Sequence, residues 1–518
     1  MSGEGSPDPV EDLRSRQDAA RNVEPPAHRR TAFDRPSVRD FIGMLLDAGS
    51  SFDEVGTLAH SDHKEHAAGT PGDGKVSGHG RINGRSVTVA ADEARVKRAS
   101  TSYVGNVKLH RIFDQAMAAG NPFIYLGQTG GARLPDCLGS AGHTRLEPMP
   151  YFSRRNRRIP MVTAIVGESF GGSSLISALS DFTVQLRGSC LAISSPLVIS
   201  EATGEEPGFE ELGGVDVHDR RTGQIDRGAE DFPQAAALIR EFFSYLPQNG
   251  WTAPPQRSAA ATAEPDTAIG DVVPASLRQP YDMRRLLRRL VDDGRFLELR
   301  PGVGRGVLTG LATIGGISIG LVASQPMHVA GAVTPKGCDK IVRLLCTCDA
   351  FGLPVLFVQD TPGFLVGTSV EHDNLLSKAM LMHQAVAQAS VPTLTVIVRK
   401  SYGLATACLA GPGMGTDTIW AWPGARIGFM DPNVAVRVLD RKELAGLEPA
   451  ERDAEVARRA DLLGQDNSVY GAAGIMRVDE VIEPGQTRDR IARRLRELAA
   501  RAPVSQDRRI LATWPTSW

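Results

Sequence analysis

The feature that most constrains this chain is an internal duplication at a separation of 232 residues. Residues 160–173 (PMVTAIVGESFGGS) align with residues 392–405 (PTLTVIVRKSYGLA), and six of these fourteen positions are identical. At the same separation, residues 121–134 align with residues 353–366. Unrelated stretches would match at about one position in fifteen. A single separation that holds over several segments predicts two copies of a whole domain, not a solenoid, whose repeats are only about 20–50 residues long.

Each copy alternates short apolar strands with helical patterns. Residues 86–92 (SVTVAAD) and 317–323 (ISIGLVA) read as buried strands. Residues 107–120 and 338–352 have helical spacing and end in glycine, which is a C-cap signal. Another apolar strand follows each helix. This alternation predicts an α/β fold with largely buried strands.

Composition divides the chain into four parts. Residues 1–36 are rich in Arg, Asp, Glu and Pro and predict a flexible N-terminal arm. Residues 251–274 begin with an Ala-, Thr- and Pro-rich stretch and predict a linker. The remaining residues, 37–250 and 275–518, are each long enough to bury a core of their own.

Charge and cysteine content exclude several classes of protein. Lys and Arg number 58 against 60 Asp and Glu, so nothing suggests nucleic-acid binding. No apolar run is long enough for a membrane span, and the start of the chain lacks a secretory pattern, so we expect a cytoplasmic protein. Six cysteines without two close pairs predict no structural metal site and no disulfide framework. His60, His63 and His66 could bind a metal, but a solvated polar segment is the expected reading.

Glycine-containing turns follow the two central strands of each copy, at residues 127–133 and 167–174 and at residues 359–367 and 399–407. Backbone N–H groups beside glycines at the start of a helix can stabilise an oxyanion. Matched turns in both copies suit a reaction with two oxyanions. Motifs for a serine nucleophile elbow, a phosphate loop or a zinc protease are absent from the sequence.

The segments TGGAR, SFGG, EELGGVDVHDRRTG, FLELRPG, DTPGFLVGT and AWPGARIGFMDP, in this order, resemble the carboxyltransferase (β) subunits of biotin-dependent acyl-CoA carboxylases of the propionyl-CoA and acetyl-CoA type. The resemblance implies two tandem crotonase-like domains of the ClpP/crotonase superfamily, which agrees with the duplication. It also implies that residues 37–250 bind acyl-CoA and residues 275–518 bind carboxybiotin. The biotin arrives on a biotin carboxylase and carrier (α) subunit, and many members are homohexamers with active sites between subunits. The chain itself has no biotinylation motif.

By resemblance, two pairs of backbone N–H groups stabilise the oxyanions of the thioester enolate and of biotin. The residues of the two pairs are Gly171 with Gly172, and Leu404 with Ala405. Leu404 replaces a glycine of relatives, and Ala407 replaces an acidic residue that contributes to acyl choice in some of them. The residues expected to contact substrate are Gly130, Gly131, Ala132, Arg133, Phe170, Tyr402, Gly403 and Ala407. No metal is expected.

Three other functions remain open from the sequence. Related subunits of sodium-pumping complexes decarboxylate malonyl-type CoA esters. Biotin-independent crotonase hydratases and hydrolases place catalytic glutamates beside the oxyanion site, whereas Glu168 here precedes the glycines. A non-catalytic assembly subunit is the third alternative, because the Leu404 side chain could obstruct biotin. The sequence identifies neither the acyl group nor the α subunit.

Overall fold

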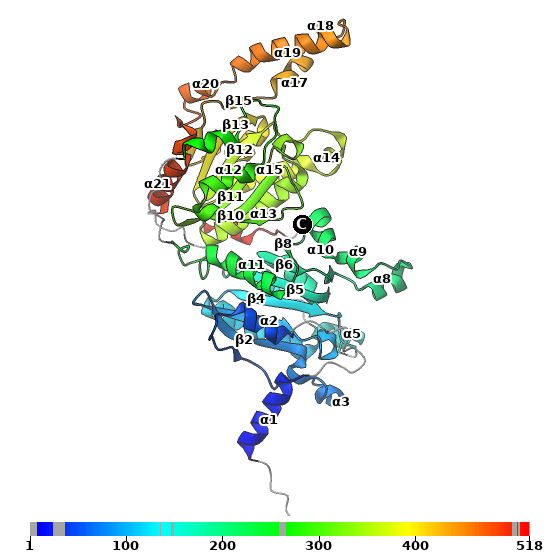
Figure 1. The fold of residues 1–518 in the computed structure, drawn as a ribbon. Coiled ribbons are helices and arrows are strands. Elements are labelled where there is room, and N and C mark those ends of the chain that lie inside the picture. Colours follow the sequence, from blue (N-terminus) through cyan, green and yellow to red (C-terminus); the bar gives the residue numbers. More distant parts are fainter. Residues whose placement is uncertain are drawn as a thin grey trace, which may run out of the picture. The chain divides into compact units, whose positions relative to one another are not determined.

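The computed structural model describes residues 8–23, 37–134, 136–146, 150–257, 266–499, 505 and 508–516. Contacts divide the chain into two compact units with a boundary between Gly250 and Trp251, except that Tyr245–Pro247 belong to the second unit. Each unit is built around one eight-stranded sheet (Figure 1).

The first unit has the strand order β1-β2-β3-β4-β5-β6-β8, with β7 paired to β5. β3, β4, β5 and β6 run parallel, while β1, β2 and β3 form antiparallel pairs. The strand bounds are β1 Asp53–Glu54, β2 Lys75–Ile82, β3 Arg85–Asp92, β4 Phe123–Thr129, β5 Met161–Phe170, β6 Phe182–Leu186, β7 Cys190–Ala192 and β8 Arg227–Ala229.

Helices cover both faces of this first sheet. α4 (Tyr103–Ala119) and α7 (Gly172–Leu179) contribute to an apolar cluster with β4 and β5, in which Phe113 and Phe123 meet edge to face at 5.1 Å. Other aromatic pairs join further helices: Phe41 of α2 (Val38–Leu45) stacks on Phe232 of α11 (Phe232–Tyr245) at 4.7 Å. Phe242 of α11 stacks on β6. The shorter helices are α3 Lys64–Ala67, α5 Gly139–Arg145, α6 Pro150–Ser153, α8 Pro196–Thr203, α9 Phe209–Gly213 and α10 Val215–Val217.

The second unit has the strand order β16-β14-β13-β12-β11-β10-β9, with β15 paired to β13. Leu356 and Val358 of β12 pack with α12 and α21, and residues between them in sequence face the opposite side. The strands are β9 Phe296–Leu299, β10 Val307–Ile314, β11 Ile317–Ser324, β12 Val355–Thr361, β13 Thr393–Tyr402, β14 Thr418–Ala421, β15 Arg426–Gly428 and β16 Glu480–Val481. The helices are α12 Met283–Leu290, α13 Pro335–Phe351, α14 Thr368–His372, α15 Leu375–Gln388, α16 Leu404–Cys408, α17 Pro432–Leu439, α18 Arg441–Leu444, α19 Pro449–Gln465, α20 Val469–Gly474 and α21 Thr487–Ala499.

The predicted duplication is confirmed element by element. β2, β3, α4, β4 and β5 have the same lengths as β10, β11, α13, β12 and β13, and every bound differs by 232 residues. Even the irregularity between β4 and β5, at Gly127 and Thr129, recurs at Gln359 and Thr361. After α7 and α16 the separation changes, since β7 and β15 lie 236 residues apart. The α/β architecture and both glycine-containing turns therefore occur twice.

Two boundary segments differ from a simple arm and linker. Residues 1–36 include a helix, α1 (Pro9–Arg21), in which Ala20 is buried and Arg21 pairs with Glu54 at 3.6 Å. Within 251–274, Ile269 and Val272 belong to the core of the second unit. The rest of both segments lies partly outside the described residues. Among the described helices, none is long and apolar enough to cross a membrane.

Candidate active site

In the first unit, an unpaired backbone N–H group lies just after each of the strands β4 and β5. Ala132 follows the β4 turn, and its neighbours are fixed on both sides: the Thr101 N–H donates to Gly131 O, and the Arg133 N–H donates to Thr101 O, each at 2.8 Å. Gly172 is the first residue of α7. Among the described residues, neither the Ala132 nor the Gly172 N–H has a hydrogen-bond acceptor. Thr129 and Ser169 are paired across β4 and β5, and each precedes its free N–H by three residues.

Gly171 holds this turn but does not offer a donor, which corrects the expectation that its N–H stabilises the enolate. Its φ of 63° and ψ of −120° are accessible only to glycine, and its N–H donates to the carbonyl of Ile193 at 3.0 Å. Ile193 directly follows β7, whose pairing with the end of β5 brings that carbonyl to the turn. The bond orients the next peptide, so Gly172 carries the free N–H.

The second unit repeats this arrangement at the ends of β12 and β13. Gly403 has φ 67° and donates its N–H to Gly428 O at 3.0 Å. Leu404 begins α16 with a negative φ, and its N–H is unpaired among the described residues, as is that of Phe364 after the β12 turn. Leu404 corresponds to Gly172, and Phe364 corresponds to Ala132. The Leu404 side chain is 54% exposed, so its bulk lies outside the packed interior.

In each unit, a strained backbone turn supports the donor that follows the first of the two strands. These donors are Ala132 in the first unit and Phe364 in the second. Lys97, Arg98 and Ala99 all have φ between 47° and 58°, and Val329 and Ala330 have φ of 43° and 55°. Left-handed conformations cost roughly 1–2 kcal/mol per non-glycine residue. In the first unit the turn aims two carbonyls at the end of β4: Arg98 O accepts the Gly130 N–H at 3.0 Å, and Ala99 O accepts the Thr129 hydroxyl at 2.9 Å. The strain therefore fixes the strand end that leads to Ala132.

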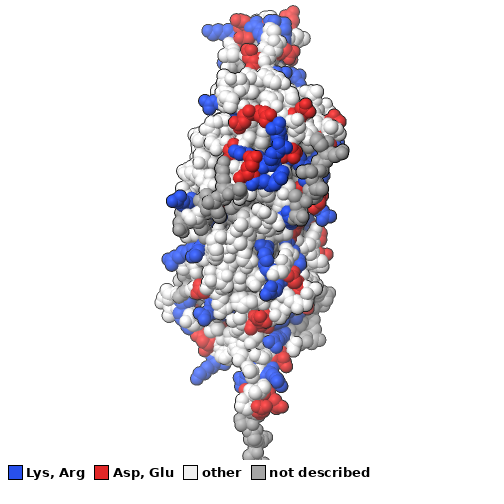
Figure 2. Space-filling model, turned by 90° about the vertical axis from the view of Figure 1, so that its left-hand side faces the viewer, with Lys and Arg blue, Asp and Glu red and all other residues white. Residues whose placement is uncertain are grey.

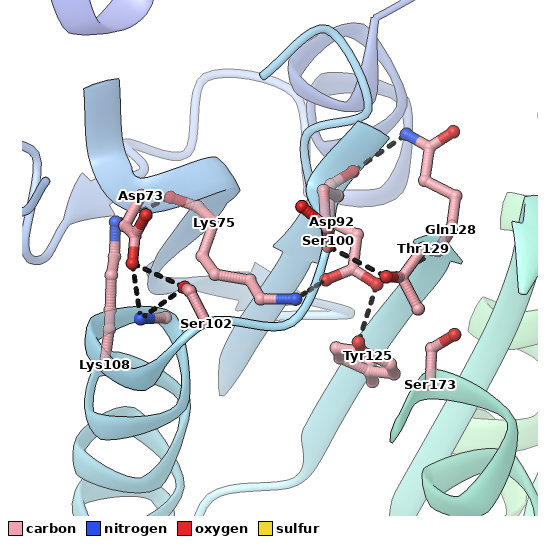
Figure 3. Close-up of polar contacts among 12 residues, drawn as sticks. Asp73, Lys75, Asp92, Ser100, Ser102, Lys108, Tyr125, Gln128, Thr129 and Ser173 are labelled. Carbon is pink, nitrogen blue, oxygen red and sulfur yellow. Dashed lines mark hydrogen bonds and ion pairs between the residues drawn. The ribbon is translucent and has the colours of Figure 1, made fainter. Parts of the chain in front are cut away.

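A buried ionic network lies beneath the first turn (Figure 3). Asp92, at the end of β3, pairs with Lys75 and accepts hydrogen bonds from the Tyr125 hydroxyl at 2.7 Å and the Gln128 N–H at 3.1 Å. The Gln128 side chain returns a bond to Asp92 O at 2.8 Å. Burial, followed by the charge of Asp92, raises the pKa of Tyr125 well above its ordinary value. Tyr125 thus stays protonated and locks β4 to β3.

Arg133 has a positioning role, which corrects the expectation that its side chain meets substrate. Its guanidinium is buried and bonded to Asp73 and to the Ser100 hydroxyl, the latter at 3.2 Å. Asp73 also accepts the Ser102 hydroxyl at 2.5 Å and the Gly105 N–H at 2.8 Å (Figure 3). Arg133 therefore ties the GGAR turn to the start of α4.

The aromatic residues that precede the two glycines are also buried, so the expected direct contacts of Phe170 and Tyr402 are not made by their side chains. Both residues are 1% exposed, and the Phe170 ring stacks on Phe209 with ring centres 6.4 Å apart. Burial, with a smaller contribution from Asp431, raises the pKa of Tyr402 to about 12. Ala405, the expected partner of Leu404, is buried, and its N–H also has no acceptor among the described residues. Ala407 is partly exposed one residue before Cys408, the last residue of α16. Gly130 and Gly131 shape the first turn, and Gly131 N–H donates to the Thr129 hydroxyl at 3.3 Å.

The second unit places different charges under its turn. Asp360 accepts a hydrogen bond from Arg399 Nε at 2.9 Å, and the Arg399 guanidinium lies 4.9 Å from the centre of the Tyr281 ring. The positions that correspond to Lys75, Asp92 and Tyr125 are Val307, Ser324 and Phe357 in this unit. On the face drawn in Figure 2, acidic and basic side chains are interspersed without a basic stripe.

Sequence reasoning missed three contributors. Phe364 could have been found from the 232-residue separation, because it aligns with Ala132. The acceptors Ile193 and Gly428 could not be found in this way, because they lie beyond the point at which the 232-residue separation changes. His218 has a structural role: its ring bonds to Leu191 O at 2.7 Å and to the Thr222 hydroxyl at 2.9 Å. Burial lowers the pKa of His218.

Over residues 32–509 the chain matches the carboxyl transferase domain family. It therefore belongs to the carboxyltransferase (β) subunits of biotin-dependent acyl-CoA carboxylases. It is 36% identical over 480 residues to the propionyl-CoA carboxylase beta chain of Saccharopolyspora erythraea, covering 89% of this chain and 87% of that protein. It is 32% identical to the methylmalonyl-CoA carboxyltransferase 12S subunit of Propionibacterium freudenreichii subsp. shermanii, with 90% and 89% covered.

Solved structures agree. The transcarboxylase 12S hexamer with methylmalonyl-CoA and methylmalonic acid bound superposes with a TM-score of 0.86, 30% identity and 96% of each chain covered. A single-chain long-chain acyl-CoA carboxylase gives a TM-score of 0.83 and 28% identity, covering 93% of this chain and 48% of that one. The two crotonase-like domains predicted from the sequence are confirmed, and the chain is a carboxyltransferase.

Proposed function

We propose that the first unit holds the acyl-CoA thioester and the second holds the carboxybiotin of a partner protein, and that the carboxyl group moves from biotin to the acyl α-carbon. One observation carries this assignment: each unit presents two unpaired N–H groups at the ends of equivalent, paired strands. Two amide donors without internal acceptors can stabilise an oxyanion that forms only during reaction. Two such sites match a reaction with two oxyanions.

The chemistry supplied by carboxybiotin is release of CO2, which leaves negative charge on the ureido oxygen. In the second unit, the N–H groups of Leu404 and Phe364 are placed to stabilise that oxygen. Bound biotin would also supply its ureido nitrogen as the base for the acyl α-proton, and the enolate carbon would bond to CO2 to give a malonyl-type CoA. In the first unit, Gly172 and Ala132 stabilise the enolate oxygen, so no side-chain nucleophile is needed.

Two exposed apolar residues of the first unit are proposed to contact the acyl chain. Leu134 is 67% exposed two residues after Ala132, and Ile193, whose carbonyl holds the Gly171 turn, is 76% exposed. We propose a biotin carboxylase and carrier α subunit as the partner and a homohexamer as the assembly. The cytoplasmic location stays a prediction.

The test is carboxylation of an acyl-CoA panel with labelled bicarbonate, ATP and a biotinylated α subunit. Gly172→Val places a β-branched side chain at the enolate donor, and we expect at least a 100-fold loss of activity with the oligomer intact on size-exclusion chromatography. Gly43→Val is the matched control, because a Cβ at Gly43 of α2 meets nothing within 4 Å. Full activity of Gly172→Val would place the enolate site elsewhere.

The same panel separates the alternatives. Decarboxylation of a malonyl-type CoA without ATP-driven carboxylation would favour the decarboxylase. A wild-type chain that assembles with the α subunit and catalyses neither direction would favour the assembly subunit.

A further inference from the structure

Three potential metal ligands converge at the edge of the first unit. Asp62 and His63 immediately precede α3, whereas Asp136 lies in the segment after the β4 turn, more than seventy residues later. One ligand atom from each side chain lies within 4.8 Å of the other two. Ligands about 2.1 Å from a shared tetrahedral ion are about 3.4 Å apart. Small side-chain rotations would therefore bring these three groups onto one ion.

Asp136 provides independent support, because it carries an unsatisfied buried oxygen. The side chain is 5% exposed, and its Oδ1 accepts the Tyr103 N–H at 3.3 Å. Its Oδ2 is buried without a hydrogen-bond partner. Leaving a buried carboxylate oxygen unpaired destabilises the fold, because the oxygen has lost its hydration without gaining a partner. A cation bound beside this oxygen would remove that penalty.

The nearby arginine does not fill this role. Arg145 pairs with Asp62, and its guanidinium also lies 4.2 Å from the centre of the Tyr103 ring. Among the described residues, Arg145 makes no hydrogen bond or ion pair with Asp136. The Arg145 side chain is 44% exposed, so it can retain its contact with the Tyr103 ring if Asp62 turns toward an ion.

We propose that Asp62, His63 and Asp136 bind one Zn²⁺ ion, with water completing the coordination. An imidazole and two carboxylates suit zinc, whereas Mg²⁺ prefers oxygen ligands in a regular octahedron. The ion would clamp the segment before α3 to the segment that follows Ala132. This proposed structural site differs from the expectation, drawn from the sequence, that the chain has no metal site. It gives a function to one of the three clustered histidines.

The test uses the full chain, stripped with a chelator and titrated with Zn²⁺ against a chromophoric competitor, with bound zinc counted by mass spectrometry. We expect one Zn²⁺ per chain and at least a tenfold loss of affinity in His63→Ala and in Asp136→Asn. His66→Ala is the matched control: the His66 ring is 6.3 Å from that of His63 but is not one of the three ligands, so its affinity should change less than twofold.

Thermal unfolding gives a second measurement. Zn²⁺ should raise the Tm of the wild type and of His66→Ala but not that of His63→Ala. The partly exposed His63 decides the outcome if Asp136→Asn does not fold. Wild-type protein without stoichiometric zinc, unchanged affinity in His63→Ala, or an equal loss in His66→Ala would each overturn the proposal. An equal loss would indicate a surface histidine cluster only.

Discussion

The Gly171→Ala substitution tests the orientation of the Gly172 N–H, the proposed enolate donor, without introducing a steric clash. A Cβ at this position meets nothing within 4 Å, so the cost arises from the backbone, whose φ is 63°. If alanine keeps this conformation, the fold loses about 1–3 kcal/mol. If the peptide rotates instead, the 3.0 Å bond to Ile193 O is broken and the Gly172 N–H turns away from the enolate. Loss of one oxyanion donor lowers kcat by roughly 10²–10³.

We therefore expect Gly171→Ala to lower kcat by about two orders of magnitude while the KM for acyl-CoA changes little, because the donor acts mainly in the transition state. The assay is steady-state carboxylation with labelled bicarbonate, with circular dichroism to verify folding. Gly49→Ala is the control, since Gly49 also has positive φ (78°) and free space but is exposed elsewhere in the first unit. A folded Gly171→Ala protein with kcat within threefold of wild type, or an equal loss in Gly49→Ala, would refute the reasoning.

Three further predictions concern the network, a buried lysine and the second donor. Asp92→Asn should reduce the free energy of unfolding in urea by about 3 kcal/mol, because it leaves buried Lys75 unpaired; a loss below about 1 kcal/mol would contradict this. Burial lowers the pKa of Lys108 from 10.5 to about 8, so the unfolded chain binds more protons between these values and stability should rise with pH there. The free energy of unfolding of wild type relative to Lys108→Met should increase by about 2–3 kcal/mol from pH 7 to pH 10.5, and a flat or falling difference would be evidence against it. Leu404→Gly should lower the KM for the biotinylated carrier several-fold with kcat nearly unchanged, and an unchanged KM would show that this side chain does not obstruct biotin.

Much of the fold follows from local sequence signals. The Gly120 and Gly352 caps end α4 and α13 in the left-handed conformation, as glycine after a helical pattern predicts. The glycine-containing turns after β4 and β5 are predicted in the same way, but the sequence pairs Gly172 with Gly171 as enolate donors and gives Ala132 only as a substrate contact. Helix α1 was missed because its sequence is strongly polar.

The parts that could not be predicted depend on long-range contacts. Asp92 and Lys75 look like ordinary strand-end charges in sequence, and only the antiparallel pairing of β2 with β3 makes them buried partners. Arg133 appears available for substrate until the fold brings Asp73 to it. The pairing of Gly171 with Ile193 O requires β7 at the end of β5, which no local pattern encodes.

The buried charged side chains beneath the turn differ between the two units, and this difference has an evolutionary consequence. The first rests on the Lys75–Asp92 pair, whereas the corresponding positions in the second are uncharged and its acid, Asp360, is held by Arg399. Each half can therefore accumulate substitutions that alter its local electrostatic field without disturbing the other half. A lineage of such proteins can diversify its choice of carbon skeleton while the chemistry of the shared carboxyl donor stays constant.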